Sequence, residues 1–313
     1  MCVACDLLTG LDLDELSPLE PGAALALHLP DGNAGLGLDD AGTLHLKRLP
    51  TLGSNRHWAP AAIGAALPAT FRAAREAYEG YRRAAADGRV RGDLKWQLSV
   101  PSPFTWLSRT LPPDDVAGQL DGAHQRLVQE LAAFAAAVPV SDVALQWDLA
   151  AETALWESRG RDLTAGRQLA GRVLEGLIGL AGAWPAEAQL GFHLCRRDVA
   201  GATAADPLDA AQLSHLAGAL LASVDRNIDF LHVPAAREAS PEWFSPYARL
   251  QAWPDTELHV GLAWADDAPD AVAARIDAAK GALQRFAPAP ACGERPVATR
   301  QALELALESL STG

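Results

Sequence analysis

The chain has 313 residues, of which 49% are hydrophobic and 21% charged, so it is long enough to bury a sizeable core in one large α/β domain or two small ones. Its net charge of -13, without a basic cluster longer than a pair, argues against nucleic-acid binding. No apolar run approaches the ~20 residues of a membrane span, no leader-like segment opens the chain, and four cysteines make no disulfide scaffold. We therefore expect a cytoplasmic protein without a membrane partner, whose thiols are free or metal-bound.

Residues 1–48 are the least regular part of the sequence. Segments 23–29 and 43–49 alternate in polarity, and Asp, Gly and Asn residues typical of turns lie between them. We expect these two segments to pair as a β-hairpin in an N-terminal extension. The CxxC spacing of Cys2 and Cys5 has no second CxxC to complete a zinc signature, so it is a weak candidate for metal or redox chemistry.

From residue 49 onward, a strand pattern followed by a helix pattern occurs seven times. This alternation predicts a parallel sheet with helices outside it, and seven or eight such units fit a (β/α)₈ TIM barrel over residues 49–313. Neither a dinucleotide-binding glycine motif nor a Walker loop is present. The expected strands are 49–56, 94–100, 143–148, 190–194, 228–234, 257–263 and 286–291. The expected helices are 67–86, 113–137, 162–182, 207–224, 240–251, 268–284 and 296–310.

Side chains suited to chemistry stand at the predicted carboxyl ends of these strands, where a barrel gathers its catalytic residues. They are Ser54, Asp148, His193, Cys195, His232 and Cys292. His193 and Cys195 are two residues apart, so on a strand they point to the same side. Two thiolates and two imidazoles form a tetrahedral Zn²⁺ donor set. Taken singly, each could instead be a buried cysteine or a hydrogen-bonded core histidine.

Four short motifs in this order resemble the catalytic barrel of cobalamin-independent methionine synthase, in the superfamily that includes uroporphyrinogen decarboxylase. Thr51-Leu52-Gly53-Ser54 is similar to the family's Thr-Ile-Gly-Ser, and Leu145-Gln146-Trp147-Asp148 to its Ile-Gln-Ile-Asp. His193-Leu194-Cys195 is similar to its zinc-binding His-x-Cys, and Ala291-Cys292-Gly293 to its Asp-Cys-Gly. The resemblance covers roughly residues 49–310 and indicates a divergent, single-barrel member.

The resemblance implies zinc-dependent methyl transfer to a thiol, as in a 5-methyltetrahydropteroyl-homocysteine methyltransferase. It implies that Ser54 and Asp148 bind the thiol substrate. The sequence departs from the family at His232, which stands where the family has a glutamate ligand; Glu238 is a rival ligand from the following loop. The family's acidic residue for the substrate ammonium has no match in 87–93, and its N-terminal barrel for folate has no counterpart.

We therefore predict a zinc-dependent methyl or alkyl transferase that acts on a small-molecule thiol. The methyl donor is a folate, a corrinoid protein or a small methylated compound. Asp148 and His193 are the predicted catalytic residues, and Ser54, Asp148 and Trp147 the substrate-binding ones. Two alternatives stay open: a metal-free lyase or decarboxylase that uses Asp148, His193 and an arginine such as Arg56 or Arg237, and a non-catalytic, degenerate barrel.

Overall fold

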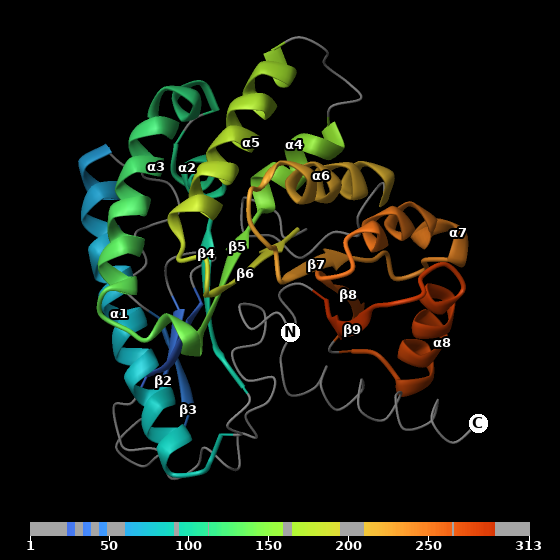
Figure 1. Ribbon diagram of the computed structural model, residues 1–313, viewed down its shortest axis with the longest axis horizontal. Coiled ribbons are helices and arrows are strands. Elements are labelled where there is room, and N and C mark those ends of the chain that lie inside the picture. Colours follow the sequence, from blue (N-terminus) through green and yellow to red (C-terminus); the bar gives the residue numbers. More distant parts are fainter. Residues whose placement is uncertain are drawn as a thin grey trace.

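The computed structural model describes residues 24–28, 34–38, 44–48, 60–90, 94–111, 113–158, 165–194, 210–264 and 266–291. Over these residues the chain is a mixed α/β fold, in which helices alternate with the strands of a parallel sheet (Figure 1). No helix in the described ranges combines the length and the apolar character that crossing a lipid bilayer requires.

The parallel sheet has six strands in the order β4-β5-β6-β7-β8-β9, so sequence neighbours are also spatial neighbours. Each pair is parallel, which requires a crossover connection between consecutive strands, and the helices supply it. The strands are β4 (Trp96–Pro101), β5 (Val143–Asp148), β6 (Gln189–His193), β7 (Phe230–Pro234), β8 (Glu257–Ala263) and β9 (Ala287–Pro290).

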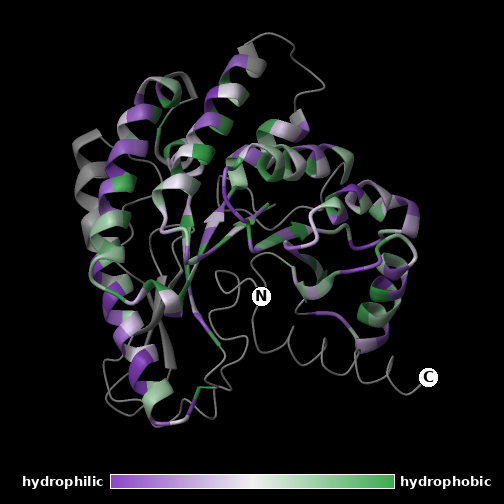
Figure 2. Ribbon diagram, viewed as in Figure 1, coloured by the Kyte–Doolittle hydropathy of each residue, from purple (hydrophilic) through white to green (hydrophobic). Residues whose placement is uncertain are grey.

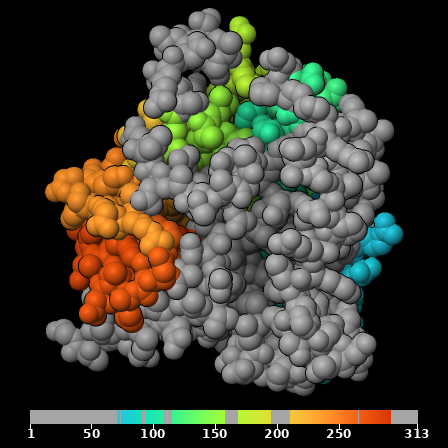
Figure 3. Space-filling model, turned by 180° about the vertical axis from the view of Figure 1, so that it is seen from behind, coloured from blue at the N-terminus to red at the C-terminus, as the bar shows by residue number. Residues whose placement is uncertain are grey.

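The helices lie against the sheet, and α1, α3 and α5 stand side by side (Figure 1). Hydrophilic and hydrophobic stretches alternate along α3 and α5, as expected for helices with one face on a core (Figure 2). Seen from behind, residues 210–264 and 266–291 form one block at one side of the molecule (Figure 3). The helices are α1 (Pro60–Ala86), α2 (Pro103–Thr110), α3 (Pro113–Ala135), η1 (Val140–Asp142), α4 (Ala150–Ser158), α5 (Ala165–Ala183), α6 (Ala210–Ser223), α7 (Pro241–Phe244), η2 (Ser245–Ala252) and α8 (Pro269–Lys280).

The two faces of the parallel sheet differ in chemistry. Because side chains alternate along a strand, the register places one set of residues on each face. One face is apolar and belongs to the hydrophobic core: Leu98, Val100, Leu145, Trp147, Leu190, Phe192, Leu231, Val233, Leu258 and Val260. The other face is largely polar and nevertheless buried: Gln97, Ser99, Gln146, Asp148, His193, His232 and His259.

The predicted alternation of strands and helices is confirmed for six of the expected strands, and the parallel sheet with it. The expected strand at 49–56 and the expected helix at 296–310 lie outside the described residues. Within the described residues the sheet is open, with β4 and β9 at its two edges. Closure into a (β/α)₈ barrel therefore stays a prediction.

The N-terminal hairpin was predicted incorrectly. Segments 23–29 and 43–49 do not pair with each other: β1 (Ala24–His28) and β3 (Leu44–Arg48) both pair with a middle strand, β2 (Ala34–Leu38), in an antiparallel sheet. The sequence of β2 contains two glycines and follows turn residues, which favoured a loop over a strand. The extension is thus a three-stranded meander.

Two helices directly after strands have no counterpart among the expected helices. Pro103 occupies the first turn of α2, where a missing N–H costs nothing, and the Ser102 side chain caps that helix. The segment after Asp148 is also helical, as α4, and includes Glu152 and Trp156. Both helices begin within two residues of a strand end and therefore stand next to the polar face.

A histidine outside the polar face is half-buried between two helices. His124 lies on α3, and its ring occupies the space beside Gly176 on α5, where a Cβ atom would collide with it. Its Nδ1 donates a hydrogen bond to the carbonyl oxygen of Leu120 at 2.8 Å. Burial lowers the pKa of His124 below its ordinary value of 6.5, and the hydrogen bond offsets this only in part.

Lowering the pH from 7.5 to 5.5 should therefore destabilise the fold partly through His124. The unfolded chain takes up this proton near pH 6.5, whereas the folded chain takes it up only at lower pH, so acid favours unfolding. The contribution is complete above about pH 6.5 and is lost as the pH falls toward the folded pKa. Urea unfolding at both pH values should show a weaker pH dependence for His124→Gln than for the wild type. An unchanged pH dependence contradicts the assignment.

Candidate functional site

A row of ionisable side chains crosses the polar face of the sheet. Asp148, His193, His232 and His259 are register partners on the four neighbouring strands β5, β6, β7 and β8. All four are buried, with between 1% and 7% of each residue exposed. Ionisable groups rarely collect in a protein interior without a functional or structural partner, so this row is the candidate site.

Asp148 connects the row to a buried hydrogen-bond chain on β4 and β5. Its Oδ1 accepts a hydrogen bond from Gln146 Nε2 at 2.8 Å and one from His193 Nδ1 at 3.1 Å. Gln146 Nε2 also lies 3.5 Å from Ser99 Oγ, which accepts a hydrogen bond from Gln97 at 3.1 Å. An ionised carboxylate can only accept, so the proton of neutral His193 is on Nδ1 and its lone pair is on Nε2.

His232 is the neighbour of His193 in the row, and the two imidazole rings stack. Their centroids are 4.5 Å apart and their planes differ by 17°. Among the described residues, neither ring nitrogen of His232 has a hydrogen-bond partner, although only 1% of the residue is exposed. Leaving a buried polar group unsatisfied costs about 1–3 kcal/mol, which a ligand at this ring would recover.

His259 ends the row on β8. Its Nε2 lies 3.4 Å from Glu257 Oε2, and its ring is edge-on to Phe230 at 6.1 Å between centroids. Burial lowers the pKa of His259 below 6.5 more than the Glu257 hydrogen bond raises it, so this ring is neutral at pH 7. The row therefore continues one strand further than the predicted donor set.

Backbone hydrogen bonds extend the sheet beyond the regular strands at this site. The amide of Ser102 donates to the carbonyl of Asp148 at 3.1 Å, and the amide of Leu149 to that of His193 at 2.9 Å. The amide of Leu194 donates to the carbonyl of His232, also at 2.9 Å. The carbonyls of three row residues are thus bound by the neighbouring strand, which fixes the backbone that carries their side chains.

The structure brings together three of the predicted site residues: Asp148, His193 and His232. Ser54, Cys195 and Cys292 lie outside the described residues, so their predicted roles stay predictions. Trp147 is placed elsewhere: it is fully buried in the apolar core, on the opposite face of the sheet from Asp148. Alternation along β5 separates the two neighbours, and the geometry does not support the predicted substrate contact of Trp147.

Zinc is the metal that the sequence resemblance implies, and the donors in the row suit it chemically. A carboxylate that holds Nδ1 of a histidine is the usual support of a zinc-binding imidazole, and Asp148 stands in that position toward His193. The unsatisfied nitrogens of His232 supply a second buried imidazole. The lone pairs lie in the ring planes, so two nearly parallel rings cannot point to one ion, and one ring must turn. Accordingly, no three His, Cys, Asp or Glu side chains of the described residues form a ready metal cluster.

Sequence reasoning missed a second buried network beside the row. The carboxyl group of Glu152, on α4, accepts hydrogen bonds from the hydroxyls of Ser102 and Thr105, the latter at 2.6 Å. The hydroxyl oxygens in turn accept from the amides of Thr105 and Ala151, both at 2.9 Å. Ser-Pro at a helix start was the available signal for this cap. The network ties the first turns of α2 and α4 together at the carboxyl ends of β4 and β5.

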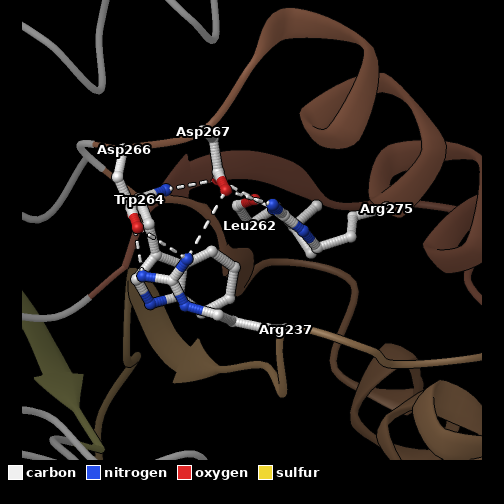
Figure 4. Close-up of polar contacts among 6 residues, drawn as sticks. All are labelled: Arg237, Leu262, Trp264, Asp266, Asp267 and Arg275. Atoms are coloured by element: carbon white, nitrogen blue, oxygen red, sulfur yellow. Dashed lines mark hydrogen bonds and ion pairs between the residues drawn. The ribbon is translucent and has the colours of Figure 1, made fainter.

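Arg237, a candidate for binding a carboxylated substrate, is occupied by acidic partners (Figure 4). Its guanidinium group lies 2.8 Å from Asp266 Oδ1 and 3.8 Å from Asp267 Oδ1. The same group lies over the ring of Trp264, whose other neighbour is the guanidinium group of Arg275. Two arginines and two aspartates balance in charge, so this cluster offers no excess positive charge to a substrate.

Comparison of the sequence with protein-family models gives no match, and neither does comparison with curated proteins. Among solved structures, the chain is similar to a B12-independent methionine synthase from Shewanella sp. W3-18-1, determined in complex with selenomethionine. The two share 17% sequence identity with a TM-score of 0.41. The match covers 69% of this chain and 62% of the synthase chain, so it spans less than two thirds of that protein.

Proposed function

We propose that this protein is a zinc-dependent methyl or alkyl transferase that acts on a small-molecule thiol. The observation that carries the proposal is the buried Gln146–Asp148–His193 hydrogen-bond chain beside the unsatisfied ring of His232. His193 and His232 belong to the predicted donor set, and the structure places them on neighbouring strands in register. The other two members, Cys195 and Cys292, follow Leu194 and Ala291 directly in the sequence.

The proposed roles follow from these contacts. His193, His232, Cys195 and Cys292 would hold the zinc ion, which lowers the pKa of a bound thiol and makes its thiolate available near neutral pH. Asp148 keeps the proton of His193 on Nδ1, and Gln146 keeps the Asp148 carboxylate in place. In the transfer the donor–methyl bond breaks, a sulfur–carbon bond forms, and the thiol proton leaves to solvent. Ser54 and Asp148 would bind the polar end of the thiol substrate.

A metal-free lyase or decarboxylase is the alternative with the most chemistry in common, because Asp148 and His193 would also serve as its acid–base pair. That reaction needs a free arginine for the substrate carboxylate. Arg237 is neutralised by Asp266 and Asp267, and Arg56 lies outside the described residues. The unsatisfied nitrogens of His232 have no role in this alternative, so the zinc-dependent transferase accounts for more of the site.

Protein purified without added metal should contain about one zinc ion per chain by elemental analysis. His232→Ala and Cys292→Ala should each weaken zinc binding roughly 10–100-fold in competition with a chelator, since each removes a proposed ligand. His259→Gln is the matched control: His259 is buried in the same row, on the next strand, but is not a proposed ligand. It should retain its zinc.

Wild-type protein that binds no zinc, or binds it equally well without His232 and Cys292, ends the zinc proposal. Retained metal in both variants together with loss in His259→Gln would reassign the ligands. The transfer itself is tested by incubating the zinc-loaded protein with small thiols and each of the three donor classes. Mass spectrometry should detect a thioether with one of them.

A further inference from the structure

An open hollow lies between α6 and η2, away from the polar face of the sheet. Its volume is about 370 Å³, and the described residues that line it are Ala211, Gln212, His215 and Arg249. His215 and Arg249 are exposed, whereas Leu213 and Leu250 in the same two elements are buried in the hydrophobic core. The hollow therefore opens on the outer side of these elements and is separate from the row of buried ionisable residues.

A buried hydrogen bond holds the two walls of this hollow together. Ser214 Oγ, on α6, donates to the carbonyl oxygen of Pro246, on η2, at 2.7 Å, and Ser214 is fully buried. His215 follows Ser214 directly, and Arg249 lies three residues after Pro246. The backbones that carry the imidazole and the guanidinium group are thus fixed relative to each other by the packing of α6 on η2.

A tryptophan on α4 determines which ring nitrogen of His215 carries the proton. Trp156 Nε1 lies 3.4 Å from His215 Nδ1, and an indole N–H can only donate. Nδ1 is therefore the acceptor, and the proton of the neutral ring is on Nε2. Trp156 is 2% exposed and belongs to the hydrophobic core, so it contacts the inner side of the ring. The Nε2–H is left as a donor on the outer side.

The polar groups that line the hollow are rich in donors. Among the described residues, the guanidinium group of Arg249 has no ion-pair or hydrogen-bond partner, although the chain has a net charge of -13. The side-chain amide of Gln212 likewise has no hydrogen-bond partner in the described part of the chain. The described lining contains no acidic side chain. A guanidinium group, an imidazole N–H and an amide together suit the oxygens of an anion.

We propose that this hollow binds a small organic molecule through a phosphate or carboxylate group, which Arg249 and His215 hold and Gln212 supports. A guanidinium group can donate two parallel N–H bonds to such a group, and His215 Nε2 can donate a third. The volume of the hollow lies within the range of small-molecule sites, so there is space for more than the anionic group. None of these residues belongs to the proposed zinc site, so this binding site is independent of the proposed transferase function.

NMR titration of the full chain with inorganic phosphate, methyl phosphate and acetate tests the proposal, with chloride as the reference anion. The ring signals of His215, assigned with His215→Phe, should shift and saturate with at least one oxyanion. Arg249→Gln should weaken binding roughly 10-fold or more, because a charge-assisted contact is lost. Arg82→Gln is the matched control: Arg82 is an exposed arginine on α1 that lies 3.6 Å from Glu79. It should bind the oxyanions as the wild type does.

Tighter binding of methyl phosphate than of acetate would assign a phosphorylated ligand, and the reverse a carboxylated one; either result supports the site. A response to the oxyanions that does not saturate, or that chloride reproduces, overturns it. Equal weakening in Arg249→Gln and Arg82→Gln also overturns it, because the attraction would then be a general effect of charge. Imidazole nitrogen shifts of the free protein should place the proton of His215 on Nε2. A proton on Nδ1 contradicts the role of His215 as a donor.

Discussion

Asp148→Asn should lower the rate of thioether formation and the zinc affinity by roughly 10–100-fold each. The amide oxygen of asparagine can still accept from Gln146 and His193, so the geometry around Oδ1 is retained. The negative charge is lost, and with it the preference of His193 for a proton on Nδ1 and a lone pair on Nε2. The charge that would attract a substrate ammonium group is lost as well.

Steady-state kinetics and chelator competition on the same preparations separate these effects. A higher KM at unchanged zinc affinity would show that Asp148 acts on the substrate alone. A lower kcat together with weaker zinc binding would show that Asp148 acts on the metal site. Asp121→Asn is the control, since Asp121 is an exposed carboxylate that pairs with Arg172 on the outer helices. Wild-type rate and affinity in Asp148→Asn contradict both roles.

Asp267→Ala should lower the free energy of unfolding by about 3–5 kcal/mol, because it leaves a buried arginine without its counter-charge. The side chains of Asp267 and Arg275 are 6% and 8% exposed, and their charged groups approach to 2.6 Å. Asp267 Oδ2 also accepts from the amide of Trp264 at 2.7 Å (Figure 4). When the carboxylate is removed, Arg275 keeps the Leu262 carbonyl, at 2.9 Å, and the ring of Trp264, but no negative charge.

Urea denaturation of the metal-free protein measures this loss. Asp266→Ala is the matched control: the neighbouring aspartate pairs with Arg237, but its side chain is 72% exposed. Exposed ion pairs contribute little, so this variant should unfold close to the wild type. Equal destabilisation by the two substitutions would show that burial of the Asp267–Arg275 pair is not what stabilises this end of β8.

The sequence was sufficient for the parts of this fold that depend on periodicity. Alternation of strand and helix patterns predicted the parallel sheet, and the carboxyl ends of its strands led to Asp148 and His193. The full row was not predictable, because it depends on register: His232, predicted as a donor at a strand end, lies in mid-strand beside His193, and His259 joins the row only through its pairing with His232. Trp147 was predicted to bind substrate because it is the neighbour of Asp148. Side chains of neighbouring residues on a strand point to opposite faces, so Trp147 lies on the apolar face instead.

Some local sequence patterns were compatible with two different structures, and only tertiary contacts decide between them. Pro103 both ends a strand and begins a helix, and the Ser102 cap decides for the helix. Glu152 is a charged residue, of a type usually exposed, but two hydroxyls from another segment satisfy its buried carboxyl group. Buried polar residues of this kind resemble surface residues in a sequence, because their partners are distant along the chain.

The backbone hydrogen bonds past the strand ends have a practical consequence. The amide protons of Ser102, Leu149 and Leu194 are each held by the carbonyl of Asp148, His193 or His232. Hydrogen exchange at an amide depends on how often its bond opens. These three protons are therefore natural reporters of the site, readable by NMR or mass spectrometry without a known substrate, and each reports on a different strand.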